Sequence, residues 1–331
     1  MKKRLVDLRF GERPLLDIAS YGRGGPGRSL TRDDVAFISR TTRGVPEVMI
    51  KISGGATSPR GVQAHVGYIG REGSCEIEAD DGYILRAKGS ENTIVKEWDL
   101  DLGANRRFTN RTVAKGRKPP KLVHNLVFSM PKGTPPDRLK KAVQLFAREE
   151  FGLKHRYAMA LHTDQGHPHV HVVVKAVDEQ GKRLNIRKAT LRDWRQQFAT
   201  CLRYQGIEAN ATERAVRGEV RTPKIDGIYR AAKRGESTYW DKRIKETVRA
   251  DCSGSQLQDS GRETLRETRR QVERGWYAVH DLLERNSYDE EARHVRRFLS
   301  KMHPIQTDRE QIIDGIGRQG ERWRRDRERA I

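Results

Sequence analysis

Four of the ten histidines in this sequence lie in one short stretch, residues 161–175, which reads LHTDQGHPHVHVVVK. Within it His169 and His171 are two residues apart, with valines between and after them. Alternate residues of a β-strand project from the same face of a sheet, so we expect both imidazoles on one face. His162 stands in the same phase on the segment before. Two neighbouring strands would therefore bring three imidazoles together around one metal ion.

The chemistry that such a cluster favours is metal binding. Three neutral imidazoles are an ordinary ligand set for a divalent transition ion, and they leave coordination positions open for substrate or water. We therefore predict that His162, His169 and His171 are metal ligands. Asp164 is expected to orient one of them or to act as a base. His167 lies at the turn between the strands and is expected to contact a ligand rather than the ion. The alternative is a hydrolytic zinc site with an activated water.

The charge of the protein suggests what a metal there would act on. The sequence has 66 Lys and Arg against 45 Asp and Glu, a formal net charge of +21 at pH 7 and a pI of about 10.1. A surface this basic favours a polyanion, with nucleic acid as the first expectation and an anionic membrane or an acidic protein as alternatives. Residues 224–331 hold 25 of the basic and 20 of the acidic residues, net +5, which leaves +16 for residues 1–223.

Cysteine usage and hydropathy favour a cytoplasmic protein. The three cysteines are far apart and form neither a disulfide framework nor a zinc spacing, which fits a reducing compartment. No apolar run is long enough to span a bilayer, and no signal-peptide core follows the basic N-terminus. We therefore expect no membrane insertion.

A metal ion in so basic a protein points to phosphoryl transfer on nucleic acid, with the ion stabilising charge on the scissile phosphate. The nucleophile would be water or a side chain, and a tyrosine phenol can attack phosphorus and hold the strand covalently. The residues alone rank the nine tyrosines poorly, but Tyr68 is an attractive candidate. A helix expected over residues 59–71 can present it over the sheet, and adjacent glycines let a DNA backbone approach closely. Tyr21 and Tyr157 remain alternatives.

These side chains need a sheet to position them. Apolar residues alternate, as they do in strands, over residues 46–53, 82–87, 121–130, 156–164 and 169–177. Helical spacing of apolar residues predicts helices over residues 59–71, 135–152, 190–206, 261–286, 289–301 and 308–329. QGHP joins two of the strands as a hairpin. We therefore predict an α+β fold, an antiparallel sheet of about five strands flanked by helices, followed by a helical C-terminal region.

Two motifs resemble those of a known family. HTDQGHPHVHVVV is similar to the third motif of the conjugative and mobilisation relaxases of the HUH endonuclease superfamily, in which a His, an Asp two residues later and PHxH on a strand recur. GYIGREG (67–73) resembles their first motif, and KLVHNLVFSMPKGT and ERAVRGEVRTP (213–223) are similar to further relaxase segments. The likeness is greatest to the MobP-type relaxases and those that nick T-DNA borders, and it covers about residues 46–223. Where the family often has an asparagine after the histidine strand, Lys175 stands here.

The resemblance implies a site and a reaction. His162, His169 and His171 would bind a divalent ion, Mg²⁺ or Mn²⁺, on the face of the sheet. The family's nucleophilic tyrosine falls on Tyr68, and the aspartate that assists it falls on Asp164. Such an enzyme nicks single-stranded DNA at a transfer origin, remains joined to it by a 5′-phosphotyrosine link, and later rejoins the strand.

Partners and organisation are also implied by the resemblance. The partners would be origin-of-transfer DNA, accessory relaxosome proteins and the coupling protein of a type IV secretion system. The protein would be cytoplasmic in a bacterium, and exported while attached to the transferred strand.

We divide the chain into a basic flexible arm (1–45), a relaxase nuclease domain (46–223) and a helical accessory region (224–331). We expect DNA contacts from basic residues near Tyr68 and in a later loop: Arg60, Arg71, Arg106, Arg107, Arg111, Lys115, Arg117 and Lys118.

Two other functions remain open from the sequence. The first is a metal-dependent nuclease that uses activated water, and the second is a non-catalytic DNA-binding replication or mobilisation protein. A covalent adduct with DNA separates the relaxase from the hydrolase, and cleavage of any kind separates both from the binding protein.

Overall fold

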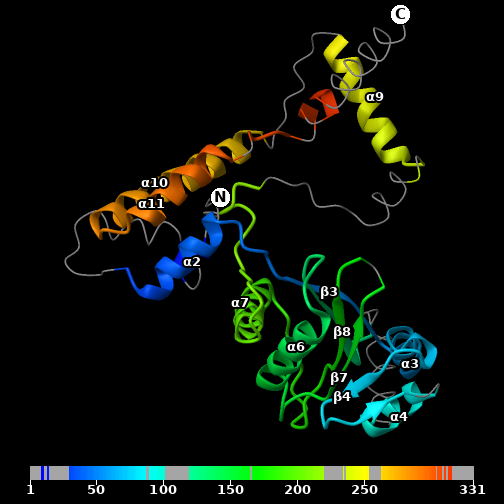
Figure 1. Ribbon diagram of the computed structural model, residues 1–331. Helices are drawn as coiled ribbons and strands as arrows, with labels where there is room; N and C mark the ends of the chain where they lie inside the picture. Colours follow the sequence, from blue (N-terminus) through cyan, green and yellow to red (C-terminus); the bar gives the residue numbers. More distant parts are fainter. Residues whose placement is uncertain are drawn as a thin grey trace, which may run out of the picture. The chain divides into compact units, whose positions relative to one another are not determined.

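The computed structural model (Figure 1) describes residues 9–10, 13–14, 30–86, 89–100, 119–164, 166–219, 234, 236–252, 262–302, 304–307, 309–310 and 312–314. The chain divides into two compact units. Gly44–Ala211 forms the first, called the sheet unit below. Met1–Arg43 and Thr212–Ile331 together form the second, called the helical unit.

The sheet unit is built on a six-stranded antiparallel sheet. Its strands lie in the order β3 (Met49–Ala56), β6 (Val123–Ser129), β8 (His169–Lys175), β7 (Tyr157–His162), β4 (Ile77–Ala79) and β5 (Ile84–Leu85). The predicted α+β fold with an antiparallel sheet is thus confirmed, with one strand more than expected. The additional strand is β4, which is too short for a two-residue alternation to be recognised in the sequence.

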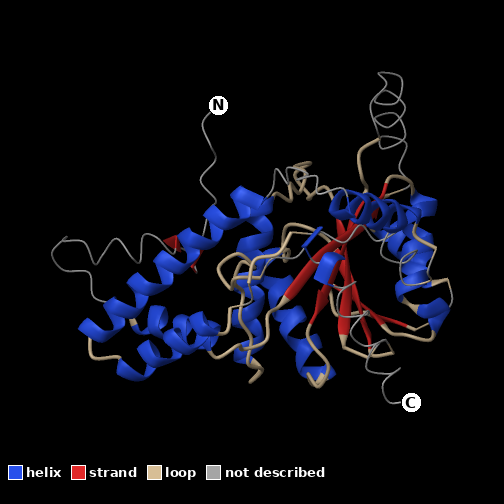
Figure 2. Cartoon of the chain, turned by 90° about the horizontal axis from the view of Figure 1, so that it is seen from above, coloured by secondary structure: helices blue, strands red, loops and turns tan. Residues whose placement is uncertain are grey.

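Helices cover both faces of this sheet (Figures 1 and 2). One face packs against α6 (Pro136–Glu150) and α7 (Lys188–Tyr204), and the other against α3 (Pro59–Ile69) and α4 (Ser90–Glu97). Strand β8 shows how alternation divides its side chains between the two cores. Val170, Val172 and Val174 join the core beneath α6 and α7, whereas Val173 joins the core beneath α3 and α4. The odd-numbered residues of β8 therefore face α3.

The core beneath α6 and α7 contains an aromatic group centred on Phe146. Its ring centroid lies within 6.4 Å of those of Phe128, Phe151, Trp194 and Phe198. We expect Phe146→Ala to lower the free energy of unfolding by about 3–5 kcal/mol, because apolar contacts are lost and a cavity remains. Chemical denaturation measures this change. Leu153→Ala, at a fully exposed position, is the control and should cost less than about 0.5 kcal/mol; equal losses would contradict the prediction.

Helix α3 begins where the sequence predicts. The Ser58 hydroxyl caps it by accepting a hydrogen bond from the Gly61 N–H at 3.2 Å, and Pro59 stands at a position where no helical N–H is needed. Its buried face is formed by Val62, Val66 and Ile69. Directly after the helix, Arg71–Gly73 are three successive residues in the left-handed region, with φ angles of 50°, 54° and 98°. This sharp turn ends α3 beside the sheet.

The helical unit has its own core. It is formed by α2 (Arg32–Thr42), α10 (Arg262–Arg285) and α11 (Asp289–Ser300), and Trp276 at its centre donates a hydrogen bond to the carbonyl of Val216 at 2.8 Å. α9 (Thr238–Cys252) also belongs to this unit. The helices predicted over 261–286 and 289–301 are confirmed. Most of the helix predicted over 308–329 lies outside the described residues.

Helix α2 corrects the expectation of an extended arm before residue 46. Thr31 and Asp34 form a reciprocal capping box at its start, with hydrogen bonds of 3.0 and 3.1 Å. Val35 and Ile38 are buried in the core that α10 and α11 supply. The prediction of an extended arm was therefore wrong for the residues of α2. The sequence conceals this helix because the apolar residues of α10 and α11 that pack against it lie more than two hundred residues further along the chain. The basic Gly-rich stretch 22–29 lies outside the described residues.

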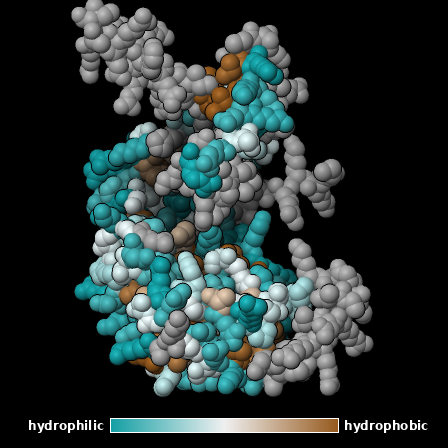
Figure 3. All heavy atoms as spheres, turned by 90° about the vertical axis from the view of Figure 1, so that its right-hand side faces the viewer, coloured by the Kyte–Doolittle hydropathy of each residue, from teal (hydrophilic) through white to brown (hydrophobic). Residues whose placement is uncertain are grey.

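None of the described helices is long and apolar enough to cross a membrane. On the face shown in Figure 3, the described side chains are mostly hydrophilic. That surface agrees with a sequence in which 34% of the residues are charged.

Candidate active site

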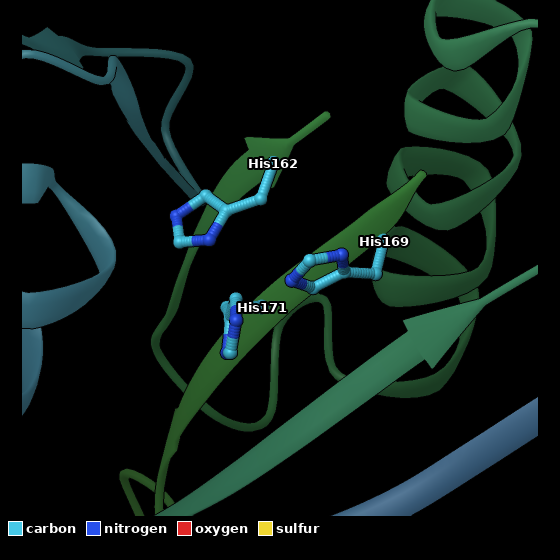
Figure 4. A group of neighbouring side chains, drawn as sticks. All are labelled: His162, His169 and His171. Atoms are coloured by element: carbon cyan, nitrogen blue, oxygen red, sulfur yellow. The ribbon is translucent and has the colours of Figure 1, made fainter. Parts of the chain in front are cut away.

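The hairpin of β7 and β8 brings three histidines together on the sheet face that α3 partly covers. His162 pairs directly with His169 across the hairpin, and His171 follows two residues later on β8. Their ring centroids lie 4.6–5.3 Å apart, and one nitrogen from each lies within 4.8 Å of the others. All three side chains are buried. Figure 4 shows the rings converging from the two strands, so the geometry expected from strand phase is present.

Hydrogen bonds to backbone carbonyls hold two of the three rings by one nitrogen each. His162 Nε2 lies 2.7 Å from the carbonyl oxygen of Ile69, and His169 Nδ1 lies 3.3 Å from that of His167. In each case the ring N–H donates to the carbonyl, which leaves the second nitrogen as a lone-pair ligand. His171 Nδ1 is buried and makes no hydrogen bond. The convergence of the three rings, two of them oriented by backbone carbonyls, fits a bound divalent ion.

Two histidines of the cluster are in the protonation state that a metal requires. Burial lowers the pKa of His171 to about 3, helped by the positive charge of the neighbouring histidines and Arg71. Burial likewise lowers the pKa of His169. Both rings are therefore neutral at neutral pH, with lone pairs available to a cation.

Tyr68 stands next to this cluster. It is the penultimate residue of α3, its side chain is exposed, and its ring centroid lies 5.9 Å from that of His171 in an edge-on arrangement. The alternative Tyr157 is buried in the core on the opposite face of the sheet, and Tyr21 lies outside the described residues. Among the described tyrosines, Tyr68 is thus the one that lies beside the three histidines.

His65 is a member of this site that the sequence did not reveal. It precedes Tyr68 by three residues on α3, and the two rings stack with their centroids 6.0 Å apart and an interplanar angle of 24°. Its centroid also lies 6.5 Å from that of His171, and burial lowers its pKa. The signal that could have identified it is the three-residue spacing from Tyr68, since residues three apart share a helix face.

Arg71 links the tyrosine to the aspartate of the histidine motif. Its guanidinium donates a hydrogen bond of 2.6 Å to Asp164 and lies 3.5 Å from His162 Nδ1 and 5.9 Å from the Tyr68 ring centroid. Partial desolvation works to raise the pKa of Asp164, but a backbone hydrogen bond and the Arg71 charge outweigh it, so that pKa is lowered. The left-handed turn that delivers Arg71 costs energy at its non-glycine residues, which is characteristic of functional sites.

The other predicted site residues take different places. His167 is exposed, and its backbone carbonyl rather than its imidazole supports His169. Arg60 is exposed on the first turn of α3. The remaining predicted DNA contacts lie outside the described residues: Arg106, Arg107, Arg111, Lys115, Arg117 and Lys118.

A histidine triad on an antiparallel sheet, beside a tyrosine carried by a helix, is the site that the relaxase resemblance implies. Residues 78–207 match the family model of the MobA/VirD2-like relaxase nuclease domain. This match confirms the relaxase resemblance over residues 78–207. The match contains the three histidines and Asp164 and begins after Tyr68.

Two known proteins are similar to the chain. The T-DNA border endonuclease VirD2 of Rhizobium radiobacter is 25% identical over 230 residues, which cover 63% of this chain and 53% of that protein. The chain thus spans about half the length of this curated relative. A solved structure titled "Molecular Basis of Vancomycin Resistance Transfer in Staphylococcus aureus" aligns with 51% of this chain and 99% of its own, at 10% identity and a TM-score of 0.30. That score is too low to support an argument.

Proposed function

We propose that this protein is a DNA relaxase that nicks one strand at an origin of transfer by metal-dependent transesterification. The observation that carries the proposal is the position of Tyr68, whose ring lies 5.9 Å from that of His171 at the edge of the histidine cluster. A nucleophile and a cation site so close together suit a reaction at phosphorus. The family match and the basic composition support DNA as the substrate.

In the proposed reaction, the Tyr68 hydroxyl attacks the scissile phosphorus. A bond forms between Oη and phosphorus, the bond from phosphorus to O3′ breaks, and the O3′ leaves as a hydroxyl after taking up a proton. The tyrosine remains joined to the 5′-phosphate, and later attack by a 3′-hydroxyl restores the phosphodiester and the free phenol. A divalent ion, Mg²⁺ or Mn²⁺, held by His162, His169 and His171 would offset the charge that develops on the phosphate oxygens.

The other site residues have proposed roles in positioning. Asp164, kept ionised beside Arg71, accepts the phenolic proton. Arg71 holds Asp164 and approaches the Tyr68 ring, and His65 stacks against that ring, so that the phenol is restrained next to the histidines. Arg60 and the basic residues between 106 and 118 contact the DNA backbone, which makes binding strongly dependent on salt.

The wider setting is proposed from the family alone. Residues 46–223 act as the nuclease domain and residues 224–331 as an accessory region. Accessory relaxosome proteins and a type IV secretion coupling protein are the proposed partners. The protein acts in the bacterial cytoplasm and leaves it attached to the transferred strand.

This proposal is tested with labelled single-stranded oligonucleotides that together cover the DNA on both sides of the gene. We expect one of them, in Mn²⁺ or Mg²⁺, to yield a shorter labelled product and a protein adduct that survives denaturation. Peptide mass mapping should place the adduct on Tyr68. Cleavage without an adduct would favour the water-using nuclease, and binding without cleavage would favour the non-catalytic protein; either result overturns the relaxase proposal.

A further inference from the structure

Two buried polar atoms on the histidine face of the sheet make no hydrogen bond: Nδ1 of His171 on β8 and Oδ1 of Asn125 on β6. Asn125 is only 7% exposed, and both atoms are shielded from solvent. A buried donor or acceptor that makes no hydrogen bond destabilises the folded state. An imidazole N–H and an amide oxygen are complementary, so a bond between them would satisfy both atoms.

The register of the sheet makes these residues neighbours. β6 and β8 are adjacent and antiparallel, with Val127 opposite His171 and Asn125 opposite Val173. Residues two apart on a strand share a face, so Asn125 projects on the same side as His171 and is its diagonal neighbour. Diagonal neighbours are about 7–8 Å apart, a span that an imidazole and a carboxamide can bridge. On its other side, Asn125 Nδ2 lies 3.9 Å from the position of a Cβ added at Gly54 of β3.

The other two histidines show what His171 lacks. His162 and His169 each donate one ring N–H to a backbone carbonyl, which fixes the tautomer and directs the second nitrogen into the cluster. A neutral His171 carries a single N–H. To offer Nε2 to an ion it must hold that proton on Nδ1, where it needs an acceptor. Asn125 Oδ1 is a buried, unused acceptor on the same face.

We propose that Asn125 positions His171, accepting a hydrogen bond from Nδ1–H and thereby presenting Nε2 to a divalent ion. Asn125 does not touch the ion, and it completes a set in which each ligand histidine is held by one oxygen acceptor. The inference rests on the metal site of the proposed function, but it requires neither DNA nor Tyr68. Its burial makes Asn125 unsuited to direct contact with a nucleic acid.

Mn²⁺ affinity without DNA, measured by titration calorimetry, tests the role of Asn125. Asn125→Leu keeps the size and removes the acceptor, and we expect it to bind Mn²⁺ about 10–100-fold more weakly. Asn125→Asp retains an oxygen acceptor and should stay close to the parent affinity. Val127→Ala, which alters packing directly opposite His171, is the matched control and should also stay close to it. An Asn125→Leu affinity within twofold of the parent overturns the proposal.

A second measurement keeps the test decisive if Asn125→Leu folds poorly. ¹⁵N NMR of the metal-free parent should find the His171 proton on Nδ1, and a proton on Nε2 would overturn the proposal. A parent that binds no Mn²⁺ would overturn the metal site and this inference together. Normal Mn²⁺ binding without DNA adducts would overturn only the proposed reaction, so the two failures are distinguishable.

Discussion

Tyr68→Phe is expected to abolish both the covalent DNA adduct and nicking, with cleavage rates falling on the order of 10⁴-fold or more, as when a catalytic nucleophile is removed. Phenylalanine lacks the oxygen that attacks phosphorus but keeps the ring that stacks on His65 and meets the edge of His171. Mn²⁺ affinity and binding of single-stranded DNA should therefore remain near those of the parent. Denaturing gels of labelled oligonucleotides measure the loss.

The control for this variant is Tyr83→Phe. Tyr83 is an exposed tyrosine in the same unit, next to β5, which β4 separates from the histidine strand β7. It should nick and form adducts at the parent rate. If Tyr68→Phe continued to cut without an adduct, water would be the nucleophile; if an adduct appeared on another tyrosine, the assignment of Tyr68 would be wrong while the relaxase reaction stood.

The histidine cluster was predictable because its information is local. His169 and His171 are two residues apart on one strand, His162 is brought opposite by a short hairpin, and the alternation of the valines sets the face. A strand's period of two leaves no other arrangement once the hairpin forms. The positions of α3, α6 and α7 around it followed from helical spacing, and that of α3 also from the Ser58 cap.

The structural features that the sequence did not reveal depend on contacts between segments that are distant along the chain. The Ile69 carbonyl that holds the His162 ring is 93 residues away along the chain. Arg71, which pairs with Asp164, adopts a left-handed backbone conformation although it is not a glycine, so the sequence does not signal the turn. Asn125 looks like an ordinary polar residue of a strand until the β6–β8 register places it diagonally from His171. Helix α2 was missed for the same reason, because its apolar face is buried by helices from the far end of the chain.

The double variant His169→Ala and His171→Ala is expected to lose Mn²⁺ binding and nicking together. Two of three ligands are removed, and the single imidazole of His162 that remains cannot hold an ion at physiological concentrations. Binding of single-stranded DNA should be largely retained, because it depends on basic side chains that are not altered. Calorimetry with Mn²⁺, oligonucleotide cleavage and a DNA-binding titration at one salt concentration measure the three properties on the same preparation.

The matched control is His167→Ala, which separates the imidazoles of the cluster from the histidine at the turn. His167 supports His169 through its backbone carbonyl, which alanine also provides, so both Mn²⁺ affinity and nicking should be preserved. A double variant that nicked at the parent rate would remove the metal from the mechanism. A double variant that lost DNA binding as well would show that His169 and His171 contact the nucleic acid rather than a cation, because the loss of an ion alone leaves the basic surface unchanged.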